Sequence, residues 1–130
     1  MDIRQVILSF IDTTDLLVST MNKYKSLITG HLDILTFQNE NEFEGIKECW
    51  NEVLIHGDPE GLRSLANLLL KLADLDQNSI EGLPVGAREH EHLRPKLDLS
   101  NSSAEVIVGR LDAKGTGAFY DRYIAKESQE

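Results

Sequence analysis

Apolar residues near the N-terminus recur three or four positions apart, as they do on one face of a helix. The first run extends from Ile3 to Ile11. The polar segment 12–15, which contains two aspartates and two threonines, can then cap a second run from Leu16 to Tyr24. We therefore expect residues 2–27 to be helical, as one kinked helix or as two helices.

Two later segments have the composition of strands. Residues 31–37 follow Gly30, and residues 50–56 end at Gly57. The segment between them, residues 40–48, is polar and rich in glutamate. It is typical of a solvated helical turn or loop, so we expect no strand there.

The clearest local signal is a helix start at residues 58–60. Asp58 can cap the first free N–H groups, Pro59 has a backbone angle suited to the first helical position, and Glu60 suits the positive end of the helix dipole. We expect this helix to run to about residue 75 and to bury its apolar face against a sheet containing residues 50–56 and 104–110. That face consists of Leu62, Leu65, Ala66, Leu69, Leu72 and Ala73, widened by Leu68 and Leu70.

The C-terminal part alternates loops with short strands. Glycine, proline, asparagine and serine mark a loop over residues 76–86, and strands are expected at 87–93 and 104–111. After a break at 114–117, a short terminal helix is expected to place four apolar residues on one side: Phe119, Tyr120, Tyr123 and Ile124.

The order of these elements predicts an α+β fold, with helices packed on one face of a small, mostly antiparallel sheet. The length of 130 residues suits a single domain over residues 1–130. Within it we expect an N-terminal helical part at about 1–30 and a β-α-β-β core at about 50–111.

Composition adds two expectations about where the protein works. The lone Cys49 cannot form a disulfide within the chain, which fits a reducing compartment. No signal peptide is readable at the N-terminus, and no window approaches the roughly 18 apolar residues of a membrane helix. We therefore expect a cytoplasmic protein without a membrane segment.

Charge indicates the kind of partner. Twenty-two acidic residues face thirteen basic ones, for a net charge of −9, and the stretch 40–60 holds seven acids against Lys47 alone. Such a surface repels phosphate backbones, which disfavours direct nucleic-acid binding, and attracts basic partners. The alternative is that the acidity only aids solubility. The candidate partner-binding residues are Glu40, Glu42, Glu44, Glu48 and Glu52.

Large apolar residues lie among these acids. Phe43, Ile46 and Trp50 can be the anchors of a protein interface, which often combines aromatic side chains with surrounding charge. The alternative is that their spacing makes them the buried stripe of an amphipathic turn. The sequence leaves both interpretations open.

The histidines are a weak candidate for metal chemistry. His90 and His92 share one side of a strand, and with His56 they can supply three ligands to a zinc ion that keeps an open position. Arg88 is expected on the same strand face, which disfavours a cation. We therefore favour structural histidines and expect neither metal nor cofactor.

No other set of residues supports catalysis. Cys49 and His56 cannot be interpreted as a nucleophilic pair from their spacing, and the thiol beside a tryptophan is expected to be a small buried hydrophobe. In residues 109–117 Lys114 precedes the glycines, whereas a phosphate loop needs the lysine after them. That segment is expected to be a flexible turn.

Several short motifs between residues 50 and 111 occur in the order known from one protein family. They are the strand before Gly57, the Gly-x-x-x-Gly-Leu segment 57–62, Leu65-Ala66, His90-x-His92-Leu93, a serine at 102 or 103, and the apolar strand 106–108. In this succession the chain resembles class thirty-two of the immunity proteins of bacterial polymorphic-toxin systems. Arg94 departs from the pattern, because an acidic residue often follows the His-x-His-Leu motif in that family.

The resemblance implies an α+β protein that binds and neutralises a cognate toxin in the cytoplasm of its producer, without catalytic residues. The charge agrees with this, because toxin domains that attack nucleic acid present basic clefts in which an acidic protein can mimic phosphate. We expect the acidic surface to occlude the toxin active site, and the chain to be a monomer or weak dimer. The alternatives are a small metal-binding enzyme that uses its histidines, and a structural or regulatory protein-binding module.

Overall fold

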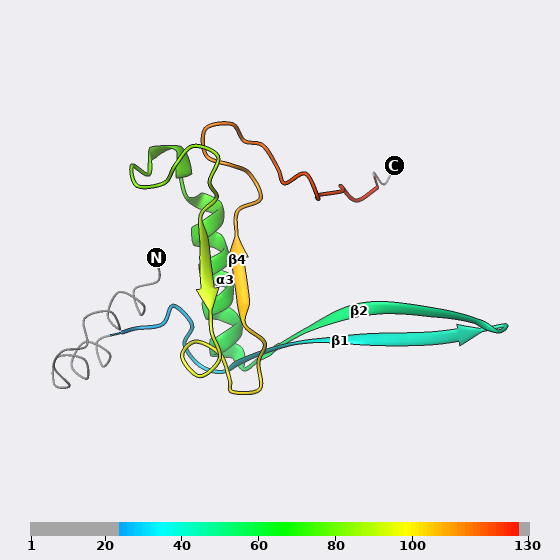
Figure 1. Ribbon diagram of the computed structural model, residues 1–130. Coiled ribbons are helices and arrows are strands. Elements are labelled where there is room, and N and C mark those ends of the chain that lie inside the picture. Colours follow the sequence, from blue (N-terminus) through cyan, green and yellow to red (C-terminus); the bar gives the residue numbers. More distant parts are fainter. Residues whose placement is uncertain (1–23, 128–130) are drawn as a thin grey trace, which may run out of the picture.

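The computed structural model describes residues 24–127 and contains one α-helix and two small antiparallel sheets (Figure 1). The elements, in chain order, are β1 (Leu32–Phe43), β2 (Ile46–Gly57), α3 (Pro59–Asp74), the 3₁₀ turn η1 (Gln77–Ser79), β3 (His90–Leu93) and β4 (Val106–Gly109). The α+β class predicted from sequence is confirmed. The expectation of a single sheet is wrong, because β2 pairs with β1 and β4 pairs with β3.

Two expectations about helices differ from what the described residues show. Residues 24–27 are not helical, so the C-terminal end of the segment predicted at 2–27 is wrong, and residues 2–23 lie outside the described range. Residues 118–127 contain a turn but no helix, so the predicted terminal helix is also wrong. There Phe119 and Tyr123 meet edge to face, with ring centroids 5.3 Å apart.

Helix α3 begins where the sequence predicts. The Asp58 carboxylate accepts a hydrogen bond from the Gly61 N–H (2.7 Å) and a second from the His31 N–H (3.0 Å). The Asp58 N–H in turn donates to the His31 carbonyl (3.1 Å). These bonds lower the pKa of Asp58, the bond from His31 contributing most. One side chain therefore caps the helix and fixes the start of β1.

Glycines allow the chain before β1 to cross the helix start closely. A Cβ on Gly61 would lie 1.9 Å from the His31 carbonyl oxygen, and a Cβ on Gly57 would lie 2.9 Å from the same atom. Both distances are too short for an L side chain. The Gly-x-x-x-Gly spacing seen in the sequence therefore has a packing role, because both glycines make room for one backbone carbonyl.

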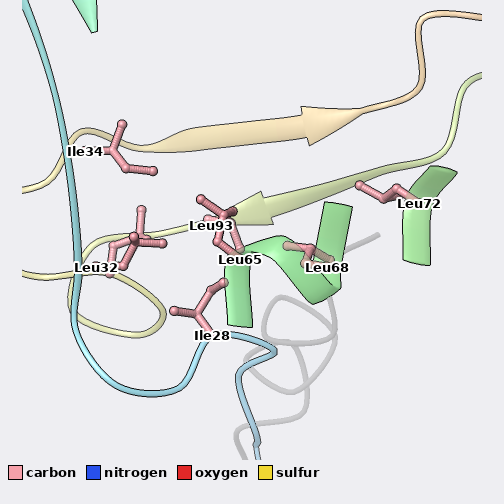
Figure 2. Close-up of a cluster of buried hydrophobic side chains, with 8 residues drawn as sticks. Ile28, Leu32, Ile34, Leu65, Leu68, Leu72 and Leu93 are labelled. Atoms are coloured by element: carbon pink, nitrogen blue, oxygen red, sulfur yellow. The ribbon is translucent and has the colours of Figure 1, made fainter. Parts of the chain in front are cut away.

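The buried core joins both sheets and the helix (Figure 2). It contains Ile28, Leu32, Ile34, Leu65, Leu68, Leu72, Leu93 and Leu99, and the partly buried Val106 and Val108 of β4 pack against it. The base of β1 and the helix thus share one core with β3.

The buried face of α3 is narrower than predicted. Leu65, Leu68 and Leu72 are buried as predicted. The other five residues of the predicted face are exposed: Leu62, Ala66, Leu69, Leu70 and Ala73. The prediction was wrong for those five because the helix is rich in leucine almost all round, so periodicity alone cannot tell which leucines face the core. Only one row of them does.

Hydroxyl groups attach the base of β1 to the loop that precedes β4. The Ser103 hydroxyl accepts a hydrogen bond from the Ile34 N–H (3.1 Å) and donates to a carbonyl. The hydroxyls of Ser100 and Ser102 donate to the Asp33 carboxylate, the latter over 2.6 Å. Both bonds lower the pKa of Asp33, that from Ser100 more strongly.

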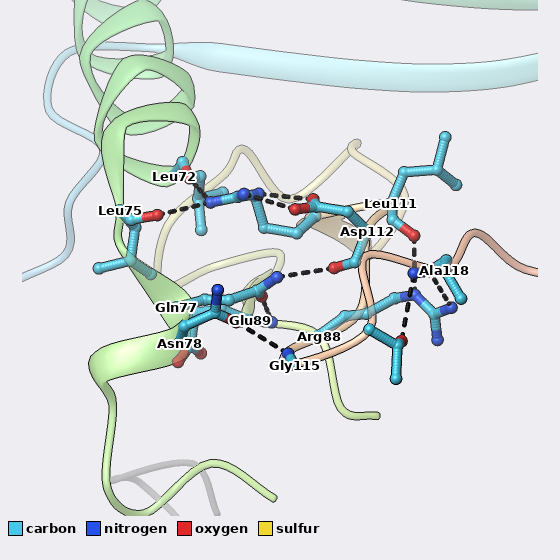
Figure 3. Close-up of polar contacts among 12 residues, drawn as sticks. Leu72, Leu75, Gln77, Asn78, Arg88, Glu89, Leu111, Asp112, Gly115 and Ala118 are labelled. Carbon is cyan, nitrogen blue, oxygen red and sulfur yellow. Dashed lines mark hydrogen bonds and ion pairs between the residues drawn. The ribbon is translucent and has the colours of Figure 1, made fainter. Parts of the chain in front are cut away.

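The C-terminal end of α3 is capped by an arginine from beyond β4 (Figure 3). The Arg110 guanidinium donates to the carbonyls of Leu72 (3.1 Å) and Leu75 (2.7 Å), which lack intrahelical partners at a helix end. Asp112 holds the guanidinium through two bonds of 2.8 and 2.7 Å. Lys114 binds the carbonyls of Ile80 and Leu83. Both basic side chains of the segment 109–117, Arg110 and Lys114, therefore donate hydrogen bonds to backbone carbonyls.

We expect Leu68→Ala to lower the free energy of unfolding by about 2–5 kcal/mol, because Leu68 is 3% exposed and its truncation leaves a cavity in the core. Leu70→Ala is the matched control on the same helix, since Leu70 is 60% exposed and its loss should change stability by less than about 1 kcal/mol. Urea denaturation of both variants measures the difference. Equal losses would contradict the assignment of the core.

Gly61→Ala should destabilise the protein although alanine is the better helix former by about 1 kcal/mol. The added methyl group would collide with the backbone of His31, so the helix start and β1 must separate. Gly82→Ala, where nothing lies within 4 Å of the new Cβ, should leave the melting temperature nearly unchanged. A stabilised Gly61→Ala variant in thermal denaturation would show that the close crossing does not form.

Candidate partner-binding surface

The candidate site is a long hairpin, here called the arm, made of β1, β2 and their turn (residues 32–57). Its base joins the core, and the rest projects away from α3, β3 and β4 (Figure 1). A two-stranded hairpin is marginal on its own in water, so the arm depends on the core at its base. This leaves both of its faces open farther out.

The turn at the tip explains why the two strands pair in this register. Glu44 and Gly45 are its two central residues, and both have positive φ, 52° and 79°. A two-residue hairpin loop of this kind matches the twist of the strands, and glycine at the second position costs no strain. Phe43 then faces Ile46, and the pairing continues without interruption to Leu32 and Gly57.

Sequence reasoning missed the outer half of the arm. Residues 40–48 were expected to be a helical turn or loop, but they form the end of β1, the turn and the start of β2. The sequence did contain a hairpin signal. The two residues Glu44-Gly45, the second of them a glycine, separate two segments in which large apolar side chains alternate with polar ones. The many glutamates obscured it, since glutamate is uncommon in strands.

The register divides the side chains of the arm between two faces, because paired residues share a face and neighbours alternate. The face here called the aromatic face carries Leu35, Phe37, Asn39, Asn41, Phe43, Ile46, Glu48, Trp50, Glu52 and Leu54. The opposite face carries Ile34, Thr36, Gln38, Glu40, Glu42, Lys47, Cys49, Asn51, Val53 and Ile55.

The five candidate glutamates are all on the arm, but the structure does not gather them on one face. Glu48 and Glu52 lie on the aromatic face, Glu40 and Glu42 on the opposite face, and Glu44 in the turn. Glu40 is also paired with Lys47, 3.0 Å away. The arm has six acidic residues and one lysine in all, so both faces are acidic.

The apolar residues of the stretch are exposed. Phe43 is 73% and Ile46 67% exposed, and Trp50 also reaches solvent, so the alternative of a buried stripe is wrong. The two tip residues line an open hollow together with Asn41 and Glu48. These side chains are exposed because none of residues 24–127 outside the arm packs on its outer part.

Glu52 is held in place by two other side chains of the arm. One of its carboxylate oxygens accepts hydrogen bonds from the Asn39 amide (2.9 Å) and from the Trp50 indole N–H (2.8 Å). These bonds lower the pKa of Glu52, the bond from Asn39 first and that from Trp50 second. The pair of bonds orients the indole ring beside a carboxylate that remains ionised.

The three histidines that were considered as an alternative zinc site do not form a cluster in the described part of the chain. His90 and His92 do lie together on β3, with ring centroids 5.0 Å apart, but His56 does not join them. Among residues 24–127, no three histidine, cysteine, aspartate or glutamate side chains are grouped to hold a metal ion. The weak zinc alternative at His56, His90 and His92 therefore has no geometric support there.

Two further expectations about reactive residues are wrong. Arg88 precedes β3 and does not share its face; its guanidinium donates to the carbonyls of Leu111 (2.7 Å) and Ala118 (2.8 Å) and stacks on Tyr120. Cys49 is exposed and not buried, because it lies on the outer part of the arm.

One known protein family resembles part of this chain. The family model described as Immunity protein 32 matches residues 52–111, slightly less than half of the chain. This confirms the resemblance to the immunity proteins of class thirty-two. The match includes α3, β3 and β4 but only the base of β2, so most of the arm lies outside it.

Two other comparisons add no relative. Neither the search of curated proteins nor the search of solved structures found a match. In the described part of the chain, no helix combines the length and the apolar character needed to cross a membrane.

The carboxylate of Glu52 should protonate only below the ordinary range for a glutamate. Because its folded-state pKa is lowered, its contribution to the stability of the arm is complete above the ordinary pKa and is lost as the pH falls through the lowered one. The indole N–H resonance of Trp50 should shift at that lower midpoint in an NMR titration. In Glu52→Gln this shift should vanish; a wild-type midpoint at the ordinary glutamate pKa would contradict the geometry.

Proposed function

We propose that this protein is an immunity protein that binds a toxin domain in the cytoplasm of the bacterium that makes both and blocks the active site of the toxin. The match to the immunity protein 32 family over residues 52–111 is the observation that carries this proposal. The protein acts by binding alone, without a cofactor and without catalysing a reaction. It does not contact nucleic acid directly.

The arm is the surface that we assign to the toxin. It projects from the core, it carries six acids against one lysine, and its large apolar side chains are exposed. Protein interfaces commonly place aromatic anchors among charged residues, as the aromatic face does with Trp50 and Phe43. The candidate residues Glu40, Glu42, Glu44, Glu48 and Glu52 supply the charge.

The mechanism follows from the shape and charge of the arm. A ribbon two strands wide can enter a cleft that a compact body cannot. A toxin domain that acts on nucleic acid has a basic cleft, and the carboxylates of the arm present negative charge to it as phosphates would. The charge speeds the encounter, while the apolar anchors slow dissociation.

Replacing Glu42, Glu44 and Glu48 by glutamine should slow association with the toxin domain encoded in the neighbouring reading frame. Removing three like charges near the tip weakens electrostatic steering, and a reduction on the order of tenfold is expected at low salt. The wild-type association rate should fall steeply with added salt. Stopped-flow mixing measures both rates, and growth protection gives a second readout.

The control variant removes three negative charges outside the arm. It carries Glu81→Gln, Asp121→Asn and Glu127→Gln, all at exposed positions. It should associate nearly as fast as the wild type. Equal slowing of both triple variants would show that only net charge matters and not the arm. If the neighbouring toxin domain does not bind the wild-type protein, the proposed function itself is wrong.

A further inference from the structure

Alternate residues of β1 direct their backbone groups away from β2. The Leu32 carbonyl accepts a hydrogen bond from the Ser100 N–H (3.0 Å), and the Ile34 carbonyl accepts one from the Ala104 N–H (2.7 Å). In an antiparallel pair, every second pair of facing residues has its N–H and C=O groups turned outward. Since the register is continuous, the even-numbered residues of β1 and their odd-numbered partners in β2 form the two outer edges of the arm.

The edge of β1 is largely closed. Its base is bonded to residues 100–104, as described above. Farther out, the side-chain carbonyl of Asn39 accepts the Glu40 N–H (2.8 Å), and that of Asn41 accepts the Glu42 N–H (3.0 Å). These asparagines occupy the donors that another strand would need.

The edge of β2 has no such cover. Among residues 24–127, nothing hydrogen-bonds to the outward N–H and C=O groups of five alternate residues: Lys47, Cys49, Asn51, Val53 and Ile55. The side chains along this edge are exposed, Val53 to 61%. An uncovered strand edge of this length is a template for pairing with another chain.

We propose that the free edge of β2 receives an extended strand of the toxin, which joins the arm as a third strand. This inference rests on the proposed function and specifies how the toxin is recognised. Main-chain hydrogen bonds then provide affinity, and the side chains that flank the edge select the strand that binds. The arm acts through its β2 side rather than equally through both edges.

The flanking side chains define the chemistry of the incoming strand. On the aromatic face, Glu48 and Glu52 flank Trp50 along β2, so they favour lysine or arginine at alternate positions. On the opposite face, Val53 and Ile55 favour apolar residues at the positions between. The preferred strand therefore alternates basic and apolar residues.

Charge argues against a second copy of this chain as the occupant. The arm has a net charge of −5 with neutral histidine, so two arms side by side would repel each other. A basic strand lowers that energy instead. The repulsion also keeps the free edge from self-association in the absence of toxin.

The test removes one outward N–H from each edge in turn. Asn51→Pro deletes a donor on the free edge of β2, and Gln38→Pro deletes the donor of the residue that faces it on the edge of β1. Neither substitution breaks a hydrogen bond between β1 and β2. With the neighbouring toxin domain as the probe, Asn51→Pro should weaken binding roughly tenfold or more, whereas Gln38→Pro should bind nearly as tightly as the wild type. Isothermal titration calorimetry measures both.

Hydrogen exchange gives a second measurement that does not depend on a variant that folds. Binding of the toxin should slow exchange of the amides of Cys49, Asn51 and Val53, and should leave that of Gln38 unchanged.

Two results would overturn the inference while wild-type binding still supports the proposed function. One is an equal loss of toxin affinity in both proline variants, and the other is slower amide exchange on the edge of β1 instead of β2. The inference would also be overturned if the wild-type protein is a dimer without toxin and the Asn51→Pro variant is a monomer. That result would show that a second copy of the chain pairs with the edge of β2. Failure of the wild type to bind would reject the proposed function itself.

Discussion

The crossing of the His31 backbone over the start of α3 is the contact on which the rest of the structure depends. Asp58 binds the N–H groups of His31 and Gly61, and Gly61 leaves room for the His31 carbonyl. This places Leu32 and Ile34, the first apolar residues of β1, in the core beside the helix leucines. The arm has a firm base only because this junction is made, since a two-stranded ribbon is marginal alone.

The junction separates the arm from the body, by which we mean α3, β3, β4 and the loops around them, and charged residues have different roles in the two parts. Arg110 and Lys114, which follow β4, are bound to carbonyls at the end of the helix and in the loop after it, so they serve structure. On the arm, three of the six acids are bound to other side chains: Asp33, Glu40 and Glu52. The other three, Glu42, Glu44 and Glu48, are exposed near its tip. The surface that we propose for the partner therefore lies on a segment that projects from the core. The family match covers α3, β3 and β4 but only the base of the arm.

Local signals in the sequence predicted helix α3, strands at 31–37, 50–56, 87–93 and 104–111, and the α+β class; the last two strands are shorter in the structure, at His90–Leu93 and Val106–Gly109. Each of these rests on neighbours within a few residues: the Asp58-Pro59 start, the glycine ends and the short apolar runs. Composition also singled out the acidic stretch, whose role stays a proposal. The short motifs also indicated a resemblance to the immunity proteins of class thirty-two, and the family model matches residues 52–111.

Tertiary structure alone decided which leucines of α3 are buried, which strands pair, and which face each glutamate occupies. Leu62, Leu68 and Leu69 look alike in the sequence, and only the single row that meets the core distinguishes Leu68. Strand pairing depends on the turn at Glu44-Gly45, where both residues have positive φ angles. This turn was not recognised in the sequence because it lies in a segment rich in glutamate. Once that register is set, alternation sends Glu48 and Glu52 to one face and Glu40 and Glu42 to the other, which no count of charge along the chain can reveal.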